Sequence, residues 1–235
     1  CNTNSFPAST ESMHANISTG VYPAQYGFIS KKTKKGAEGL EQLIQKIRKK
    51  ELRSLVLLGV EYGFAAYVIG GKQETVRVMG AEEDCAAMIF YDRSKNKFVL
   101  KKAKDELVEK IENFLGENKY KEVQQNELDK RVLEISKEII TLNKLTPSFF
   151  ILTLASLDSI GHEFGPHSKE VYKHLELLDN LIYSLIEETN SFPVIITGDH
   201  GCRTVSKYVI EPENESEIQV YRIQGQEIKP YEKHN

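Results

Sequence analysis

The sequence has no tryptophan, only three cysteines and three methionines in 235 residues, and no long apolar run. Cys1, Cys85 and Cys202 are widely spaced and form no Cys-x-x-Cys pair, which argues against a disulfide framework or a thiolate zinc site and suits a reducing compartment. The longest apolar runs, such as Phe149–Ala155, are far shorter than the roughly 20 residues of a membrane helix. We therefore predict a chain without a membrane span and with a cytoplasmic location.

The sequence has no large excess of either sign of charge. It contains 31 Lys and Arg residues and 34 Asp and Glu residues, for a formal net charge of −3. Without a strong positive field, binding to a nucleic acid duplex is not expected. The hydrophobic fraction of 40% and charged fraction of 28% are typical of a globular protein. At roughly 150 residues per domain, we predict a single α/β hydrolase-type domain over residues 1–235, in which residues 61–145 form a possible insert or cap region.

Apolar side chains recur every three or four residues in several stretches, which predicts amphipathic helices that pack against a core. In the last of them Ser168 stands where a helix N-cap is expected. The predicted helices cover Ala37–Leu52, Lys104–Leu115, Gln124–Leu142 and Ser168–Thr189.

Short continuous apolar runs predict strands buried on both faces. Two of them flank the helix Ser168–Thr189, so that this part of the chain is expected to form a β-α-β unit. The pattern indicates an α/β fold with a mostly parallel sheet. The stronger strand candidates are Ser54–Val60, Ser148–Ala155 and Pro193–Gly198, and the weaker ones are Ala65–Ile69, Thr75–Val78, Ala86–Tyr91 and Lys97–Leu100.

Two predicted strands are each followed by a polar loop with one aspartate and one histidine. Asp158 and His162 follow the strand at 148–155, and Asp199 and His200 follow the strand at 193–198. Ligands of open α/β sheets bind at the carboxyl ends of the strands, and carboxylate and imidazole groups suit a metal such as zinc. One such pair alone is equally a capping or surface pair, but two pairs in one β-α-β unit favour a metal site.

The segment at 6–28 is rich in hydroxyl side chains, among them Ser9 and Thr10. A hydroxyl residue before a helix commonly serves only as its cap. Alternatively, a hydroxyl at a helix N-terminus faces an anion and becomes a nucleophile when a metal lowers its pKa. The residues alone leave both interpretations open.

Together the three segments resemble the type I phosphodiesterase/nucleotide pyrophosphatase branch of the alkaline phosphatase superfamily. The first has Thr10 ten positions before Gly20, followed by Tyr22-Pro23 and Gly27-Phe28. The second carries Asp-x-x-Gly-His-x-x-Gly-Pro-x-Ser at 158–168, and the third carries Asp-His-Gly at 199–201. The resemblance implies an alkaline-phosphatase-like fold, a mostly parallel sheet sandwiched by helices with a mixed α/β insert.

The resemblance also implies a metal-dependent phosphoric-ester hydrolase with Thr10 as its nucleophile and Ser9 as the alternative. Two divalent metal ions are expected, zinc first, with manganese or magnesium as alternatives. Asp199 and His200 would hold the ion that also contacts Thr10, and Asp158 and His162 would hold the ion that activates water. The expected partner is a small-molecule phosphate ester such as a nucleotide.

Two ligands that the resemblance implies have no clear counterpart. An aspartate is expected upstream of Thr10, and a histidine is expected downstream, where His234 and the local substitute His167 match poorly. We expect the chain to be a piece of a longer protein, since it begins with Cys1. Otherwise it is a catalytically inactive alkaline-phosphatase-like binding or scaffold domain. A phosphomutase on the same site is a third possibility.

Overall fold

The structure is a computed structural model that describes residues 9–30, 36–80, 84–142, 147–189, 193–200, 221–224 and 227–230. The chain divides into two compact units, Cys1–Gly201 and Cys202–Asn235. The described part of the second unit is an antiparallel pair of strands, β5 (Tyr221–Gln224) and β6 (Glu227–Pro230). Every site residue described below belongs to the first unit.

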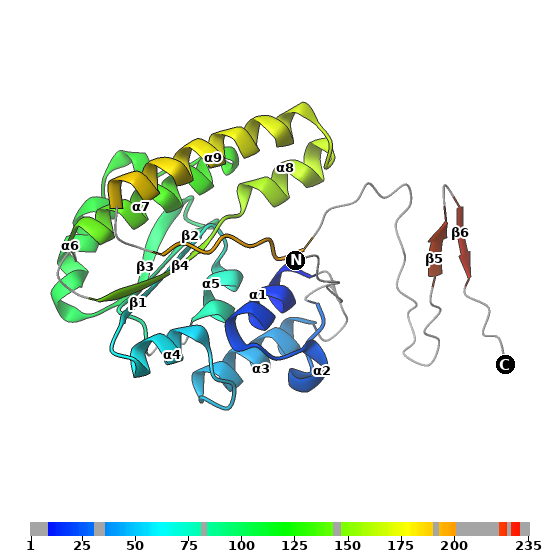
Figure 1. Cartoon of the computed structure of the whole chain (residues 1–235), viewed down its shortest axis with the longest axis horizontal. Coiled ribbons are helices and arrows are strands. Elements are labelled where there is room, and N and C mark those ends of the chain that lie inside the picture. The colour runs from blue at the N-terminus through cyan, green and yellow to red at the C-terminus, as the bar shows by residue number, and fades with distance from the viewer. Residues whose placement is uncertain are drawn as a thin grey trace. The chain divides into compact units, whose positions relative to one another are not determined.

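A mixed sheet of four strands, in the order β3-β2-β1-β4, forms the centre of the first unit (Figure 1). Strand β1 runs parallel to β2 and β4, whereas β3 is antiparallel to β2. This arrangement confirms the predicted α/β fold with a mostly parallel sheet. The strands are β1 (Ala65–Gly70), β2 (Ala87–Asp92), β3 (Lys97–Ala103) and β4 (Ser148–Thr153).

Helices cover both faces of the sheet, because successive β1 side chains point to opposite faces and both sets are apolar. Tyr67 and Ile69 join the core beneath α6 and α7, with α9 packed on α7. Ala66 and Val68 join the core on the other face, against α4 and α5. The helices are α1 (Thr10–Thr19), α2 (Pro23–Tyr26), α3 (Gly36–Arg48), α4 (Leu55–Glu61), α5 (Gln73–Met79), α6 (Asp105–Leu115), α7 (Leu128–Leu142), α8 (Ser156–Phe164) and α9 (Lys169–Thr189), with short 3₁₀ turns at Asn118–Tyr120 and Gln125–Glu127.

All four predicted amphipathic helices are present, as α3, α6, α7 and α9. The Ser168 hydroxyl accepts a hydrogen bond from the Val171 amide at 3.2 Å, which confirms the predicted N-cap of α9. Helix α3 ends at Arg48, before the predicted Leu52, because the chain turns at Lys50, whose φ is +62°.

Two predicted strands are wrong. Residues 54–60 and 75–78 form the helices α4 and α5. Ser54 caps α4, since its hydroxyl accepts from the Leu57 amide at 3.2 Å. An apolar run of this length fits a buried strand or a buried helix equally well, and the cap decides for the helix.

The third strong candidate, Pro193–Gly198, also forms no strand in the described part of the chain. The segment is extended but exposed, and Ile195 retains 92% of its accessible surface. The predicted β-α-β unit therefore has its first strand, β4, and its helix, α9, without the second strand. Three strands of the sheet come from residues 61–145, and the interpretation of that region as an insert stays a prediction.

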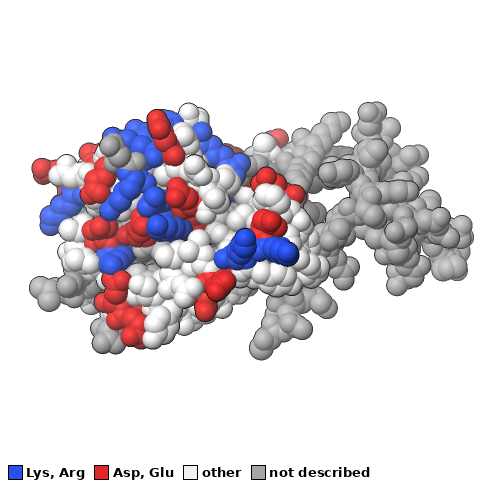
Figure 2. All heavy atoms as spheres, turned by 90° about the horizontal axis from the view of Figure 1, so that it is seen from above, with Lys and Arg blue, Asp and Glu red and all other residues white. Residues whose placement is uncertain are grey.

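One face of the molecule shows how the charged side chains are distributed on it (Figure 2). On the face that carries α9 and its neighbours, positive and negative side chains are interspersed (Figure 2). None of the helices within the described ranges is both long enough and apolar enough to span a membrane.

Candidate functional site

Helix α1 begins with Thr10, and the hydroxyl of this residue lies at the head of the helix. Thr10 Oγ1 is 3.2 Å from Nε2 of His200, a residue 190 positions later in the sequence. Both side chains are half-buried. The structure thus brings the predicted nucleophile segment and the Asp-His-Gly segment together.

Small hydroxyl side chains allow α1 to pack closely against its neighbours. The Ser12 hydroxyl donates to the Ile29 carbonyl at 2.5 Å, and the Ser18 hydroxyl donates to the Met79 carbonyl at 2.8 Å. Tyr26 donates to the Ser12 carbonyl at 3.0 Å, and burial raises the pKa of Tyr26 to about 12. The hydroxyl groups of Ser12 and Ser18 therefore hold α1 against its neighbours. The Thr10 hydroxyl is instead directed at His200.

Asp199 and His200 follow the extended segment 193–198. The His200 amide donates to Asp199 Oδ1 at 2.9 Å, and His200 Nε2 lies 3.5 Å from Asp199 Oδ2. A third residue contacts this pair, because Nδ1 of His14 lies 3.6 Å from Asp199 Oδ2. The pair therefore faces α1 through both Thr10 and His14.

His14 lies one helical turn after Thr10 on α1. Its Nδ1 donates to the Thr10 carbonyl at 2.7 Å, which sets the tautomer with the proton on Nδ1. Burial lowers the pKa of His14, against the opposing effects of the Thr10 carbonyl and the Asp199 charge. The imidazole is therefore neutral at pH 7.

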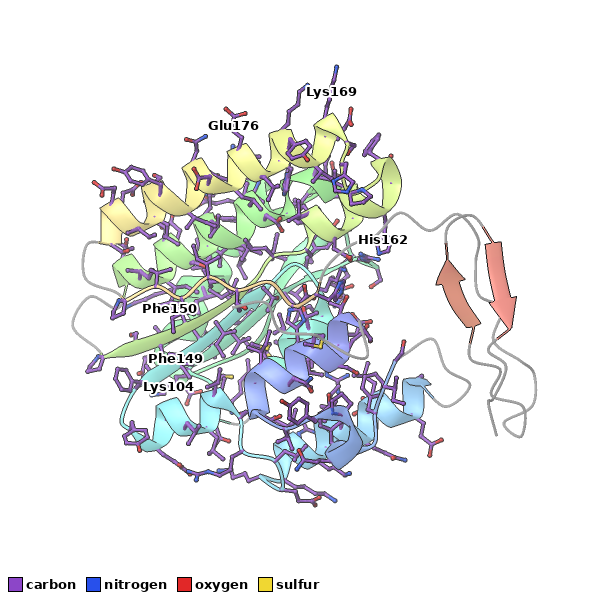
Figure 3. The ribbon with its side chains drawn as sticks, turned by 45° about the vertical axis from the view of Figure 1, so that its right-hand side comes forward. Lys104, Phe149, Phe150, His162, Lys169 and Glu176 are labelled. Atoms are coloured by element: carbon purple, nitrogen blue, oxygen red, sulfur yellow. The ribbon has the colours of Figure 1, made fainter. Side chains whose placement is uncertain are left out.

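Asp158 and His162 lie on α8, and this corrects the expectation that they stand in a loop. Residues four apart on a helix share one face, and His162 Nε2 lies 3.3 Å from Asp158 Oδ1. His162 is 70% exposed, whereas Asp158 is 28% exposed. Figure 3 shows His162 at the opposite end of the sheet from Phe149 and Phe150, which lie near the start of β4.

Lys72 follows the end of β1 and donates to Asp158 Oδ2 at 2.6 Å. Burial acts to raise the pKa of Asp158, but the Lys72 hydrogen bond and charge, with smaller effects of His162 and His200, hold it below its usual value. Because both His162 and His200 act on the pKa of Asp158, the two predicted Asp-His pairs share one electrostatic neighbourhood. The described residues of this neighbourhood are Thr10, His14, Lys72, Asp158, His162, Asp199 and His200.

Two glycines allow the ends of β1 and β4 to approach so closely. Gly70 is paired with Thr153 in the sheet, and a Cβ on Gly70 would stand 1.9 Å from Thr153 Oγ1. A Cβ on Gly71 would stand 2.8 Å from the Ala155 Cβ. The missing side chains thus let Lys72 and Asp158 meet above the carboxyl ends of neighbouring strands.

Comparison with known proteins agrees with this arrangement. A profile of the family described as type I phosphodiesterase / nucleotide pyrophosphatase matches residues 2–221. The chain belongs to this family. The resemblance seen in the three sequence motifs is thereby confirmed, and the family is one of phosphoric-ester hydrolases.

Curated relatives of this chain include proteins named for snake venom phosphodiesterases. It is 32% identical over 82 residues to "Venom phosphodiesterase CdcPDE" from Crotalus durissus collilineatus and to "Venom phosphodiesterase" from Naja atra. It is 30% identical over 82 residues to "Venom phosphodiesterase 2" from Crotalus adamanteus. The match covers 32% of this chain and 10% of each relative, so the chain spans about a tenth of the length of these relatives.

The donor chemistry of the candidate site agrees with the types of metal ion that the family implies. Carboxylate, imidazole and hydroxyl groups are ligands for zinc, manganese and magnesium. Each Asp-His pair offers two ligands, but no three His, Cys, Asp or Glu residues of the described chain stand close enough to hold one ion. The Lys72 ammonium group already places one positive charge against Asp158.

The remaining candidates of the sequence analysis have no described contact with this cluster of ligands. His167 is exposed in the turn before α9. His234 lies outside the described residues, as do Cys1 and Cys202, and Cys85 is buried. Ser9 precedes α1 and donates to Glu11 Oε2 at 3.2 Å, so its hydroxyl is directed at a carboxylate.

Lys72 and His14 were not predicted as site residues, although the sequence position of each could have indicated one. Lys72 follows Gly70-Gly71 directly after a correctly predicted strand, at the same carboxyl edge that drew attention to Asp158. His14 stands four residues after Thr10, and in the helix α1 the two residues therefore share one face.

Proposed function

We propose that this chain hydrolyses phosphodiester or pyrophosphate bonds of small molecules such as nucleotides, with Thr10 as the nucleophile. The observation that carries the proposal is the 3.2 Å approach of Thr10 Oγ1 to His200 Nε2 at the N-terminus of α1. Backbone N–H groups at a helix N-terminus favour an anion. Substrate phosphate and nucleophile therefore fit the same place.

In the proposed reaction Thr10 Oγ1 forms a bond to phosphorus while the bond from phosphorus to the leaving oxygen breaks. The proton of the Thr10 hydroxyl passes to the leaving oxygen, which departs as an alcohol and leaves the phosphoryl group esterified to Thr10. Water then attacks phosphorus, the bond to Thr10 Oγ1 breaks, and the hydroxyl is restored as the phosphate monoester leaves. His200 orients the Thr10 oxygen, and the backbone amides at the start of α1 bind the nonbridging oxygens.

Two divalent metal ions complete the proposal, zinc first and manganese or magnesium as alternatives. Asp199, His200 and Thr10 would hold one ion, and Asp158 and His162 the other. The ions supply Lewis-acid stabilisation and a lowered pKa of the bound hydroxyl and water. Lys72 contributes by orienting the Asp158 carboxylate through the hydrogen bond that it donates to Oδ2 at 2.6 Å.

The test is hydrolysis of bis(p-nitrophenyl) phosphate by the purified chain with Zn²⁺ or Mn²⁺. Thr10→Ala is expected to lower kcat/KM by about 10³-fold or more, which is about 4 kcal/mol of transition-state stabilisation. Thr10→Ser keeps a hydroxyl and should retain measurable activity. Ser9→Ala examines the alternative nucleophile. Full activity of Thr10→Ala would exclude Thr10 as the nucleophile.

Thr19→Ala is the matched control, since Thr19 is on the same helix and donates to the Ala15 carbonyl at 2.7 Å. Its activity should stay within about twofold of the wild type, because surface changes away from the site usually shift stability by no more than about 0.5 kcal/mol. Mass spectrometry of protein quenched during turnover should find the phosphoryl group on Thr10.

A binding or scaffold domain without catalysis is the second candidate. The observation that favours it is the absence, among the described residues, of three ligands close enough for one metal ion. Metal analysis separates the two candidates, because a catalytic chain should hold close to two ions and a scaffold fewer than one. The cytoplasmic location stays a prediction.

A further inference from the structure

A buried carboxylate outside the proposed catalytic set connects three helices next to the site. Asp129 on α7 is fully buried, and its Oδ2 lies 3.0 Å from Nε2 of His174 on α9, which is 5% exposed. A carboxylate without hydrogen-bond partners is very unfavourable in such a place. The hydrogen-bond partners of Asp129 therefore indicate its role in the structure.

The other carboxylate oxygen binds the start of α8. Asp129 Oδ1 accepts from the Ala155 amide at 2.6 Å and from the Ser156 amide at 3.0 Å. The residue before α8 is Ala155, which has no side chain able to cap the helix. Asp129 therefore acts as an N-cap supplied by a neighbouring helix, and its negative charge complements the helix dipole.

The side chain of Ser156 in turn bonds to the backbone at the start of α7 and just before it. Its hydroxyl accepts from the Asp129 amide at 3.3 Å and donates to the Gln125 carbonyl at 2.9 Å. Ser156 is itself fully buried. The first turn of α8 is thus held by side-chain and backbone groups at once, which restricts both its position and its rotation.

Asp158 lies in this same first turn, two residues after Ser156, and His162 follows one turn later. Because the backbone of Ser156 is fixed, the starting point of the Asp158 side chain is fixed as well. We propose that Asp129, supported by His174, is a positioning residue that holds α8 so that Asp158 and His162 point into the site. This inference rests on the proposed function of those two residues.

The experiment compares Asp129→Ala, Asp129→Asn and His174→Gln with the wild-type chain. The matched control is Ser136→Ala on the same helix, since Ser136 is equally buried but donates only within α7, to the Val132 carbonyl at 2.7 Å. Two quantities are measured for each protein: the Zn²⁺ dissociation constant by chelator competition, and the rate of amide hydrogen exchange in α8 and in α1.

Loss of a residue that orients a metal ligand typically lowers metal affinity 10- to 100-fold. We expect Asp129→Ala to weaken Zn²⁺ binding by about tenfold or more, and to accelerate exchange in α8 but not in α1. Asp129→Asn keeps an oxygen for the two amides and should recover part of the affinity. If Asp129→Ala fails to fold, His174→Gln and Asp129→Asn carry the test, with an expected weakening of about threefold.

Zn²⁺ affinities and α8 exchange rates that match those of Ser136→Ala would overturn the positioning role. A folded wild-type chain that binds Zn²⁺ but hydrolyses no phosphodiester would contradict the proposed function instead. In that case the affinity difference between Asp129→Ala and Ser136→Ala still decides whether Asp129 positions the α8 ligands.

Discussion

The two Asp-His pairs of the site have the same chemistry but very different supports. Asp158 and His162 stand on a helix whose first turn is held by the buried Asp129. Asp199 and His200 stand at the end of an exposed, extended segment, and their described side-chain contacts beyond the pair itself run to α1. One pair is therefore placed by the sheet and its helices, and the other by its neighbours in the site.

The two aspartates also face different cations. Asp158 contacts the ammonium group of Lys72, whereas Asp199 contacts His14, whose pKa is lowered chiefly by burial. The first pair therefore has a lysine beside it, and the second has a buried imidazole. The Asp199 pair is thus the part of the site where an added cation would change the charge balance most.

The largest expected effect comes from replacing each aspartate by its amide. Asp158→Asn and Asp199→Asn should each lower kcat/KM on bis(p-nitrophenyl) phosphate by about 10³-fold, because in the proposed reaction each metal ion would supply several kcal/mol of transition-state stabilisation. Because the two pairs are held in place differently, the two variants should differ in the rate of amide hydrogen exchange near each pair. Asp199→Asn should accelerate exchange over 193–200, while Asp158→Asn leaves α8 unchanged. Equal acceleration in both segments would contradict the comparison.

A smaller effect is expected on the free energy of unfolding, when the two chain segments that precede the Asp-His pairs are compared. Ile151 in β4 is 8% exposed, and Ile195 is 92% exposed. Ile151→Ala should lower the free energy of unfolding by about 3 kcal/mol. Ile195→Ala should change it by less than about 0.5 kcal/mol. Urea unfolding of the two variants measures both values, and a similar loss for Ile195→Ala would show that residues 193–198 are packed as a strand.

The smallest expected effect concerns the charge beside Asp158, in the metal-free chain. The folded-state pKa of Asp158 is lowered, so its contribution to stability is present above its usual value of about 3.9 and is lost as the pH falls through the folded-state pKa. Lys72→Met should raise that pKa and cost about 1 kcal/mol at pH 7. The difference from the wild type should shrink in acid.

Lys72→Arg is the control for this measurement, because it keeps the charge and should keep the pH profile of the wild type. Urea unfolding at a series of pH values follows both variants. A constant difference between Lys72→Met and the wild type at every pH would mean that Lys72 acts through packing and not through its charge.

The sequence was sufficient for the parts of the fold that have a clear period or a clear boundary. The helices α3, α6, α7 and α9 have apolar stripes, and strands β1 to β4 are bounded by turn residues. Residues 54–60 and 75–78 have neither an alternating nor a helical stripe over enough residues to decide between strand and helix. For residues 54–60 the cap of Ser54 favours the helix, and both helices bury apolar side chains in the core on one face of the sheet.

Within the site, motif spacing identified Thr10 and both Asp-His pairs, which the structure brings into one neighbourhood. Asp129 could not be predicted in the same way. In the sequence it is one of many charged residues on an amphipathic helix, where an exposed position is the usual outcome. Only the packing of α7 against α8 and α9 shows that its carboxylate is buried and fully bonded.

The absence of side chains at Gly70 and Gly71 has a consequence for how mutations in this chain are interpreted. Neither residue contributes a reacting atom, but even one added methyl group would push the end of β1 away from Thr153 or Ala155. Saturation mutagenesis scored by turnover alone would rank both positions beside the nucleophile. Such a ranking would reflect steric clashes of the added side chains and not the loss of a reacting group. An assay of the amount of folded protein, run in parallel, distinguishes these two causes.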